Sequence, residues 1–141
     1  MLDAWIGIAW PLRFESETPR GLRETVIMRV GQVTGCRYEW VHHWGQAVAA
    51  GGSEDKLVAL RDWSRSDLFD LRERALLAYT DAIIADGHVP DEVFSEVAAH
   101  FSQTEIVELT LTASVYCHIA RFVLALAIEI EPGHSEHLEF M

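Results

Sequence analysis

The sequence predicts an all-α protein built as a single helical domain, and three observations support this. Apolar residues recur at helical spacing in several segments, as in Leu22, Val26, Val30 and Val33. Helix-starting and helix-ending residues bracket these segments, and no stretch shows the two-residue alternation typical of strands. The 141 residues, half of them hydrophobic, are enough for one sizeable core.

We expect a bundle of about six to seven helices. In chain order they cover about residues 2–10, 19–33, 35–50, 54–62, 70–86, 90–100 and 102–128. Pro11 is expected to stop the first helix, because proline disrupts a helix interior. Thr18 is expected to cap the second, with Pro19 at its first helical position. Gly35 separates the second from the third, and Ser53 is the expected cap of the fourth.

Two later helix starts match the capping-box pattern, in which a short polar residue is followed three positions on by glutamate. These pairs are Asp70 with Glu73 and Ser102 with Glu105. Gly87 is expected to end the helix that Asp70 begins. We divide the chain into a folded domain over residues 1–131 and a flexible, solvated tail over residues 132–141 that is rich in acidic residues and histidine.

Charge and cysteine content narrow the classes of partner and compartment. The formal net charge is -11, and such a surface repels nucleic acid and anionic lipid. Two cysteines are too few for a disulfide framework, so we expect a cytoplasmic protein. The apolar segment 110–128 contains Arg121 and stands alone, so we interpret it as a core or interface helix and expect no membrane span.

The reactive side chains are concentrated at the junction of the second and third helices. Cys36, Glu39 and His43 are spaced three and seven positions apart, so they share one helical face. We expect Cys36, in the first turn, to have a lowered thiol pKa, and Glu39 to share a proton with His43. An antiparallel hairpin would bring Glu24 of the preceding helix to the same site. We take these four residues as the candidate catalytic group.

Three neighbours of this group are assigned to the wall of a small-molecule substrate pocket: Tyr38, Trp40 and His42. Tyr38 and His42 project from other faces of the third helix than Glu39 and His43. Trp40, like Trp44, also suits the hydrophobic core. A structural interpretation of the candidate catalytic group also stays open. A glutamate–histidine pair at this spacing is common on solvated helix faces, and a cysteine in the first turn of a helix is often inert and only packs.

The run Gly-Cys-Arg-Tyr-Glu-Trp at residues 35–40 resembles the carboxymuconolactone decarboxylase-like superfamily, which includes the alkyl hydroperoxidase D-like proteins. The resemblance covers about residues 2–127, with further agreement at 22–24, 42–43, 72–79, 105–110 and 120–122. It implies an all-helical fold, homo-oligomers that are often trimers or hexamers, and a site in a cleft near subunit contacts.

The sequence differs at one position from the motif of the peroxidase branch of that superfamily. The branch's glutamate falls on Glu24, the first cysteine of its Cys-x-x-Cys pair on Cys36, and its histidine on His43. The second cysteine falls on Glu39, and a carboxylate cannot form the disulfide that completes a two-cysteine cycle. Cys117 lies in an apolar run and is interpreted as a core cysteine.

The function we expect from these residues is acid–base chemistry, meaning proton transfer or decarboxylation, on a small organic acid, lactone or carbonyl compound. One alternative is a thiol-dependent peroxidase that cycles Cys36 through sulfenic acid. A second is a non-catalytic oligomeric binding protein. Zinc bound by Cys36, Glu39 and His43 is a further alternative, although we assign no metal and no other cofactor.

Overall fold

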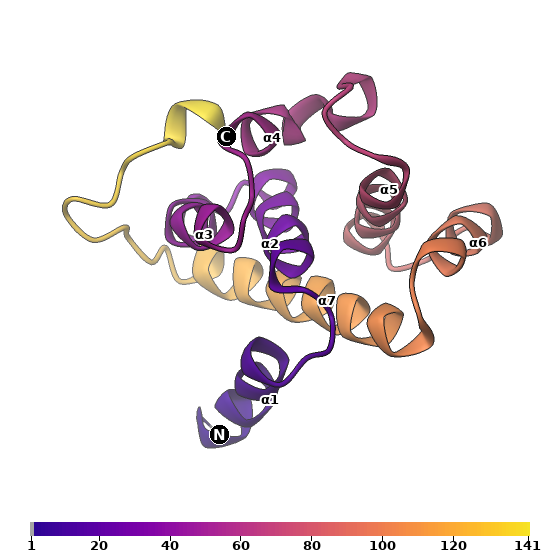
Figure 1. Ribbon diagram of the computed structural model, residues 1–141. Coiled ribbons are helices and arrows are strands. Elements are labelled where there is room, and N and C mark those ends of the chain that lie inside the picture. Colours follow the sequence, from indigo (N-terminus) through magenta and orange to yellow (C-terminus); the bar gives the residue numbers. More distant parts are fainter. Residues whose placement is uncertain (1) are drawn as a thin grey trace.

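The computed structural model describes residues 2–141, and every regular element in that range is helical (Figure 1). The elements are α1 (Leu2–Phe14), α2 (Arg20–Thr34), α3 (Arg37–Ala49), α4 (Glu54–Ala59), η1 (Leu60–Arg65), α5 (Leu71–Ala85), α6 (Asp91–His100), α7 (Gln103–Ala125) and η2 (Leu138–Phe140). The prediction of an all-α bundle of six to seven helices is therefore confirmed by seven α-helices within the described range.

Helix α2 lies at the centre of the bundle, and the other helices are arranged around it (Figure 1). Helices α3 and α5 flank it, α7 crosses beneath it, α6 packs on α5, and α1 projects from the body. The central position explains why Val26, Met28 and Val30 are fully buried. One apolar cluster joins α2 to α5, α6 and α7, and a second joins it to α3, α4 and α5.

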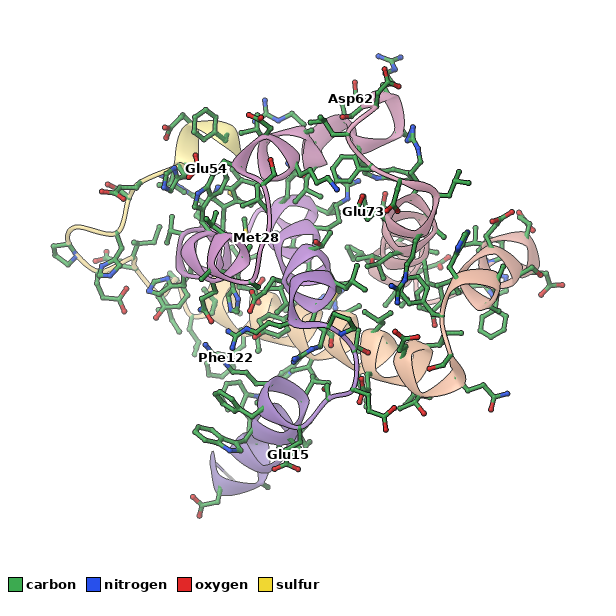
Figure 2. All side chains as sticks on the ribbon, in the orientation of Figure 1. Glu15, Met28, Glu54, Asp62, Glu73 and Phe122 are labelled. Atoms are coloured by element: carbon green, nitrogen blue, oxygen red, sulfur yellow. The ribbon has the colours of Figure 1, made fainter. Side chains whose placement is uncertain are left out.

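The charged surface predicted from composition surrounds this core. Figure 2 shows the labelled acidic side chains Glu15, Glu54 and Asp62 at the edges of the molecule, whereas Met28 lies in its middle. This separation of charge from apolar packing is the arrangement that hydrophobic burial favours.

Helix α1 does not stop at Pro11, contrary to the prediction. It continues to Phe14, with Pro11 inside it on an exposed side. The second half has partners that local sequence does not reveal: the guanidinium of Arg23 donates hydrogen bonds to the backbone carbonyls of Leu12 and Arg13. A buried arginine on α2 thus satisfies carbonyl groups at the end of α1, where the Leu12 carbonyl also accepts from the Ser16 hydroxyl at 2.7 Å.

Thr18 does not cap α2, which is a second departure from the prediction. Pro19 occupies the N-cap position, and the buried Thr18 hydroxyl donates instead to Glu108 on α7, at 2.6 Å. The backbone N–H groups of Glu17 and Thr18 also donate to the Glu108 carboxylate. The loop before α2 is therefore held to α7 by a residue that is distant in the sequence.

Both predicted capping boxes are present. The Asp70 carboxylate accepts from the Glu73 N–H at 2.8 Å, the Ser102 hydroxyl accepts from the Glu105 N–H at 3.2 Å, and both glutamates bond back to the N-cap N–H. Ser53 precedes α4 without a side-chain capping bond. Gly87 follows α5 with a φ of 81°, as expected for a residue after a helix end.

Helix α7 is the one described helix long and apolar enough to pass a length and composition test for a membrane span. In the bundle its inner face packs on α2 and α5, and Leu109, Ala113 and Ala120 are buried. Apolar side chains on other parts of α1 and α7 are exposed, among them Trp10 and Phe122. Self-association through these surfaces stays a prediction.

Residues 132–141, for which we predicted a flexible, solvated tail, contact the domain through their last residues. Its carbonyl at His137 accepts a hydrogen bond from Trp40 Nε1 at 2.8 Å, and the His137 ring stacks on Trp44 at 4.4 Å. Leu138 and Met141 pack against the cluster that contains these tryptophans. The apolar residues of the tail thus cover the outer side of α3 (Figure 1).

We expect Asp70→Ala to lower the free energy of unfolding by about 1 kcal/mol, because the Glu73 N–H loses its acceptor. Urea unfolding followed by circular dichroism measures the change. The matched control is Asp67→Ala, which removes an exposed aspartate three residues earlier. Equal effects of the two substitutions would contradict a specific role for the capping box.

Candidate functional site

A cavity of about 250 Å³ lies between four helices and contains most of the predicted site residues. Its walls come from α1, α2, α3 and α7, so the site is assembled from both ends of the chain. The lining residues are Trp5, Ala9, Leu12, Arg13, Arg23, Glu24, Ile27, Tyr38, Glu39, His42, His43, Thr112, Val115, Tyr116 and Ile119. Most of this lining is apolar, as in small-molecule sites generally.

Glu24 and His43 form the central contact of the cavity. The Nδ1 atom of His43 lies 2.8 Å from the Glu24 carboxylate, and both side chains are buried. Arg20 donates to the other Glu24 oxygen at 3.1 Å. Burial alone would raise the pKa of Glu24, but the hydrogen bond and charge of His43, together with Arg20, outweigh it and lower that pKa.

This contact determines which nitrogen of His43 is left for chemistry. An ionised Glu24 can only accept hydrogen bonds, so Nδ1 carries the proton that joins the two side chains. The other nitrogen, Nε2, makes no hydrogen bond with the described part of the chain. In neutral His43 it is therefore an unprotonated acceptor in a residue that lines the cavity.

Glu39 lines the same cavity, but its pKa is shifted in the opposite direction from that of Glu24. Its side chain is buried, and neither carboxylate oxygen has a hydrogen-bond partner among the described residues. Burial raises the pKa of Glu39 to about 8, against a weaker opposing effect of the Cys36 thiol. Glu39 is thus mostly protonated at neutral pH and can donate a hydrogen bond or a proton.

The predicted sharing of a proton between Glu39 and His43 is not what the structure shows, because His43 pairs with Glu24. The Glu39 carboxyl instead lies at the tight turn between α2 and α3, where Gly35 adopts a φ of 72°. A Cβ atom at Gly31 would lie 3.4 Å from that of Glu39. The close approach of the two helices therefore buries Glu39 against α2.

Cys36 does not have the lowered thiol pKa that we predicted. It occupies the N-cap position of α3, is fully buried, and packs with Ala120 and Val123 of α7. Burial raises the pKa of its thiol, and the charge of Glu39 adds to this effect. The desolvation of the thiol outweighs the helix N-terminus, and Cys36 is not among the cavity-lining residues.

Two of the three predicted pocket residues line the cavity, and the third does not. Tyr38 and His42 are part of the lining, and their rings stack at 4.1 Å. Both contact Glu131, which directly precedes the tail, Tyr38 by a hydrogen bond at 3.1 Å and His42 at 3.1 Å. Trp40 is fully buried in the core on the other side of α3, so its assignment to the pocket is wrong.

Tyr116 on α7 is a site residue that the sequence analysis missed. Its ring meets the His43 ring edge-on at 5.0 Å, and its hydroxyl makes no hydrogen bond with the described part of the chain. Burial raises the pKa of Tyr116 to about 12, and the charge of Glu24 adds to this. The residue is therefore a protonated donor in the cavity. A tyrosine within an apolar helix gives no local signal of this role.

No group of three or more histidine, cysteine, aspartate or glutamate side chains in the described range is arranged to hold a metal ion. Of the three residues weighed for zinc, His43 directs Nδ1 to Glu24, and Cys36 is fully buried and is not among the residues that line the cavity. We therefore explain the chemistry of the cavity by its own acidic and basic side chains.

Comparison with known proteins agrees with the fold. Residues 1–82 match the model of the carboxymuconolactone decarboxylase family, and the chain belongs to that family. The match includes α2 and α3, which supply Glu24, Glu39 and His43.

Two similar sequences come from bacteria and are named as uncharacterised proteins. The chain is 33% identical to YnjA of Escherichia coli over 123 residues, which is 86% of this chain and 67% of that protein. It is 30% identical to YdfG of Bacillus subtilis over 99 residues, or 69% of this chain and 67% of that protein.

Solved structures share the fold at lower identity. One of these structures is ATU0492 from Agrobacterium tumefaciens, a protein of unknown function that its name relates to the antioxidant defence protein AhpD. It has a TM-score of 0.84 at 24% identity, covering 92% of this chain and 90% of that one. The C82A variant of the debrominase Bmp8, in complex with 2,3,4-tribromopyrrole, has a TM-score of 0.78 at 22% identity, covering 92% of this chain and 70% of that one.

We expect Glu39→Gln to change how stability depends on pH. In the unfolded chain Glu39 ionises near its ordinary pKa of 4.5, whereas in the folded protein it keeps its proton to about pH 8. The contribution of Glu39 to the free energy of unfolding is fully present below pH 4.5. It is lost as the pH rises from 4.5 to about 8, by about 1.4 kcal/mol per pH unit. The stability of the glutamine variant relative to wild type should therefore increase between pH 5 and pH 8.

Urea unfolding at several pH values measures this difference, with Glu96→Gln on the exposed face of α6 as the matched control. The control should run parallel to wild type across the range. A parallel profile for Glu39→Gln would mean that Glu39 ionises normally in the folded protein.

A Cys117→Ser variant isolates Cys36 for a test of thiol reactivity. We expect Cys36 to react with a disulfide reagent more slowly in the folded protein than in urea, because burial both shields the thiol and raises its pKa. Absorbance of the released thiolate gives the rate. Faster reaction in the folded state would indicate an activated thiolate and would favour peroxidase chemistry.

Proposed function

We propose that this protein is an enzyme that performs acid–base catalysis on a small organic acid, lactone or related carbonyl compound. The observation that carries the proposal is a histidine that shares one largely apolar cavity with two buried carboxyl groups whose pKa values shift in opposite directions. His43 Nδ1 is held by Glu24, whose pKa is lowered, so Nε2 is left for a substrate, and Glu39, whose pKa is raised, offers a proton. Carboxyl groups driven to opposite protonation states at one pH are typical of sites with acid and base roles.

In the proposed reaction, His43 Nε2 removes a proton from the carbon next to a carbonyl group. The electron pair of the broken C–H bond forms the enol double bond, and the carbonyl oxygen takes a proton from Glu39. Glu24 accepts the hydrogen bond from the resulting imidazolium and stabilises its charge. Return of a proton from His43 to carbon, at the same or a neighbouring position, and of the enol proton to Glu39 completes the cycle.

Decarboxylation fits the same groups if the bond broken is carbon to carboxylate. Carbon dioxide then leaves, its bonding electrons form the enol double bond, and Glu39 again supplies the proton to oxygen. His43, which in this reaction takes up a proton from solvent, supplies the final proton on carbon, and the enol proton returns to Glu39, so one solvent proton is consumed for each carbon dioxide released. The two reactions share the enol, so these residues support both.

The peroxidase alternative is not favoured by the geometry around Cys36. A peroxidatic cysteine acts as an accessible thiolate, whereas Cys36 is fully buried and its thiol pKa is raised. The fold relative Bmp8 is a debrominase whose complex holds a small ring, 2,3,4-tribromopyrrole. That ligand supports a small cyclic substrate for this cavity, without specifying the reaction.

The test is a screen for deuterium incorporation into small ketones, keto acids and lactones in heavy water, followed by proton NMR, with carbon dioxide release measured in parallel. We expect His43→Gln to lower kcat/KM about 100-fold or more, as for loss of a general base. Glu39→Gln should also lower it and should remove the fall in activity above about pH 8 that ionisation of Glu39 causes in wild type.

Two control variants separate the acid–base proposal from its alternatives. Glu96→Gln on α6 should be as active as wild type, and Cys36→Ser should retain turnover if the thiol takes no part. Wild-type rates in the Glu39 and His43 variants would overturn the proposal. Turnover of hydroperoxide with an external thiol, lost in Cys36→Ser, would replace it with the peroxidase.

A further inference from the structure

Arg13 is a cationic side chain in the cavity wall without an acidic partner in the described part of the chain. It extends from the last turn of α1, and its guanidinium donates to the side-chain oxygen of Gln46, a neutral acceptor. It also lies 5.6 Å from the centre of the Phe14 ring. Neither contact offsets its positive charge.

The other arginines near the cavity are already engaged. Arg20 is paired with Glu24 at 3.1 Å and also donates to the Gln46 oxygen at 2.7 Å. Arg23 donates to the carbonyls of Thr18, Leu12 and Arg13, and the charge of Glu108 acts on it. Arg13 is therefore the guanidinium at this cavity whose charge is available to a ligand.

The Tyr116 hydroxyl is a second unused donor facing the same space. It makes no hydrogen bond with the described residues, and Tyr116 lines the cavity together with Arg13. The charge of Arg13 lowers the pKa of Tyr116 against the larger raising effect of burial. The guanidinium and the phenol thus interact electrostatically across the cavity that both of them line.

We propose that Arg13 and Tyr116 form an anion subsite that binds a carboxylate group of the substrate at the mouth of the cavity. The apolar remainder of the substrate then lies along Ile27, Val115 and Ile119, toward His43 and Glu39. This inference rests on the proposed function and narrows its substrate class to compact monocarboxylates that also bear a carbonyl or lactone group.

Charge explains why a local cation is needed for such a ligand. The protein carries a net charge of -11, so a small carboxylate meets repulsion at most of the surface. A guanidinium forms two parallel hydrogen bonds with a carboxylate and so fixes its direction as well as its position. A neutral Glu39 adds no repulsion inside the cavity near pH 7.

Binding without turnover tests the subsite directly. The probes are acetate, benzoate and 3-phenylpropanoate, each compared with its uncharged amide, by titration calorimetry at low salt and pH 7. We expect wild type to bind at least one carboxylate more tightly than its amide. Arg13→Gln should weaken that carboxylate about tenfold, a modest factor because Arg13 is exposed to solvent, and should leave the amide unchanged.

Three further variants complete the experiment. Arg65→Gln removes an equal charge from an exposed position on η1 and should bind as wild type does. Arg13→Lys keeps the charge but loses the forked geometry, so its affinity should fall between those of wild type and Arg13→Gln. Tyr116→Phe should weaken the carboxylate more than the amide. Circular dichroism verifies that each variant is folded.

Binding of no carboxylate in the panel, equal binding of acids and amides, or equal affinities of Arg13→Gln and Arg65→Gln would overturn the subsite. Other outcomes separate the subsite from the proposed function. Carboxylate binding that depends on Arg13, with no turnover of any keto acid or lactone, would retain the subsite and reject the acid–base reaction. Turnover of neutral ketones that is unaffected by Arg13→Gln would do the reverse.

Discussion

The hydrogen bond between Glu24 and His43 is the contact on which the organisation of the site depends. It joins α2 to α3 at 2.8 Å inside the bundle, where an unpaired carboxylate would be costly. Because it fixes the orientation of the imidazole, it also decides which ring nitrogen is available to a ligand. The turn at Gly35 brings the two helices together, and Gly31 lets them approach closely beside Glu39. A local backbone feature thus positions groups 19 residues apart.

The two glutamates of the cavity show how hydrogen-bond partners control the effect of burial. Both are almost fully buried, and desolvation raises the pKa of each. Glu24 receives hydrogen bonds from His43 and Arg20, which reverse the shift, whereas Glu39 has no such partner in the described range. One carboxylate is therefore ionised and the other protonated at the same pH. The same fold thereby supplies an acceptor and a donor from one residue type.

Local signals in the sequence predicted the local parts of this structure. Capping boxes at Asp70 and Ser102 depend on residues three positions away, and both are present. Thr18 failed as a cap because its partner, Glu108, lies 90 residues away. The spacing of Glu24, Glu39 and His43 indicated a common site, but the protonation of the carboxyls depends on burial and on pairing across helices. For the same reason the raised thiol pKa of Cys36 could not be predicted from a helix terminus alone.

The residues that line the cavity differ in how deeply they are buried in the core. Glu24, Glu39 and His43 lie on helices that form the core, so substitutions there disturb packing as well as chemistry. Arg13 lies on α1, which projects from the bundle and leaves most of its described side chains in solvent. Surface changes of this kind usually cost little stability. Substitutions in α1 can therefore reshape one wall of the cavity while Glu24, Glu39 and His43 keep their places in the core.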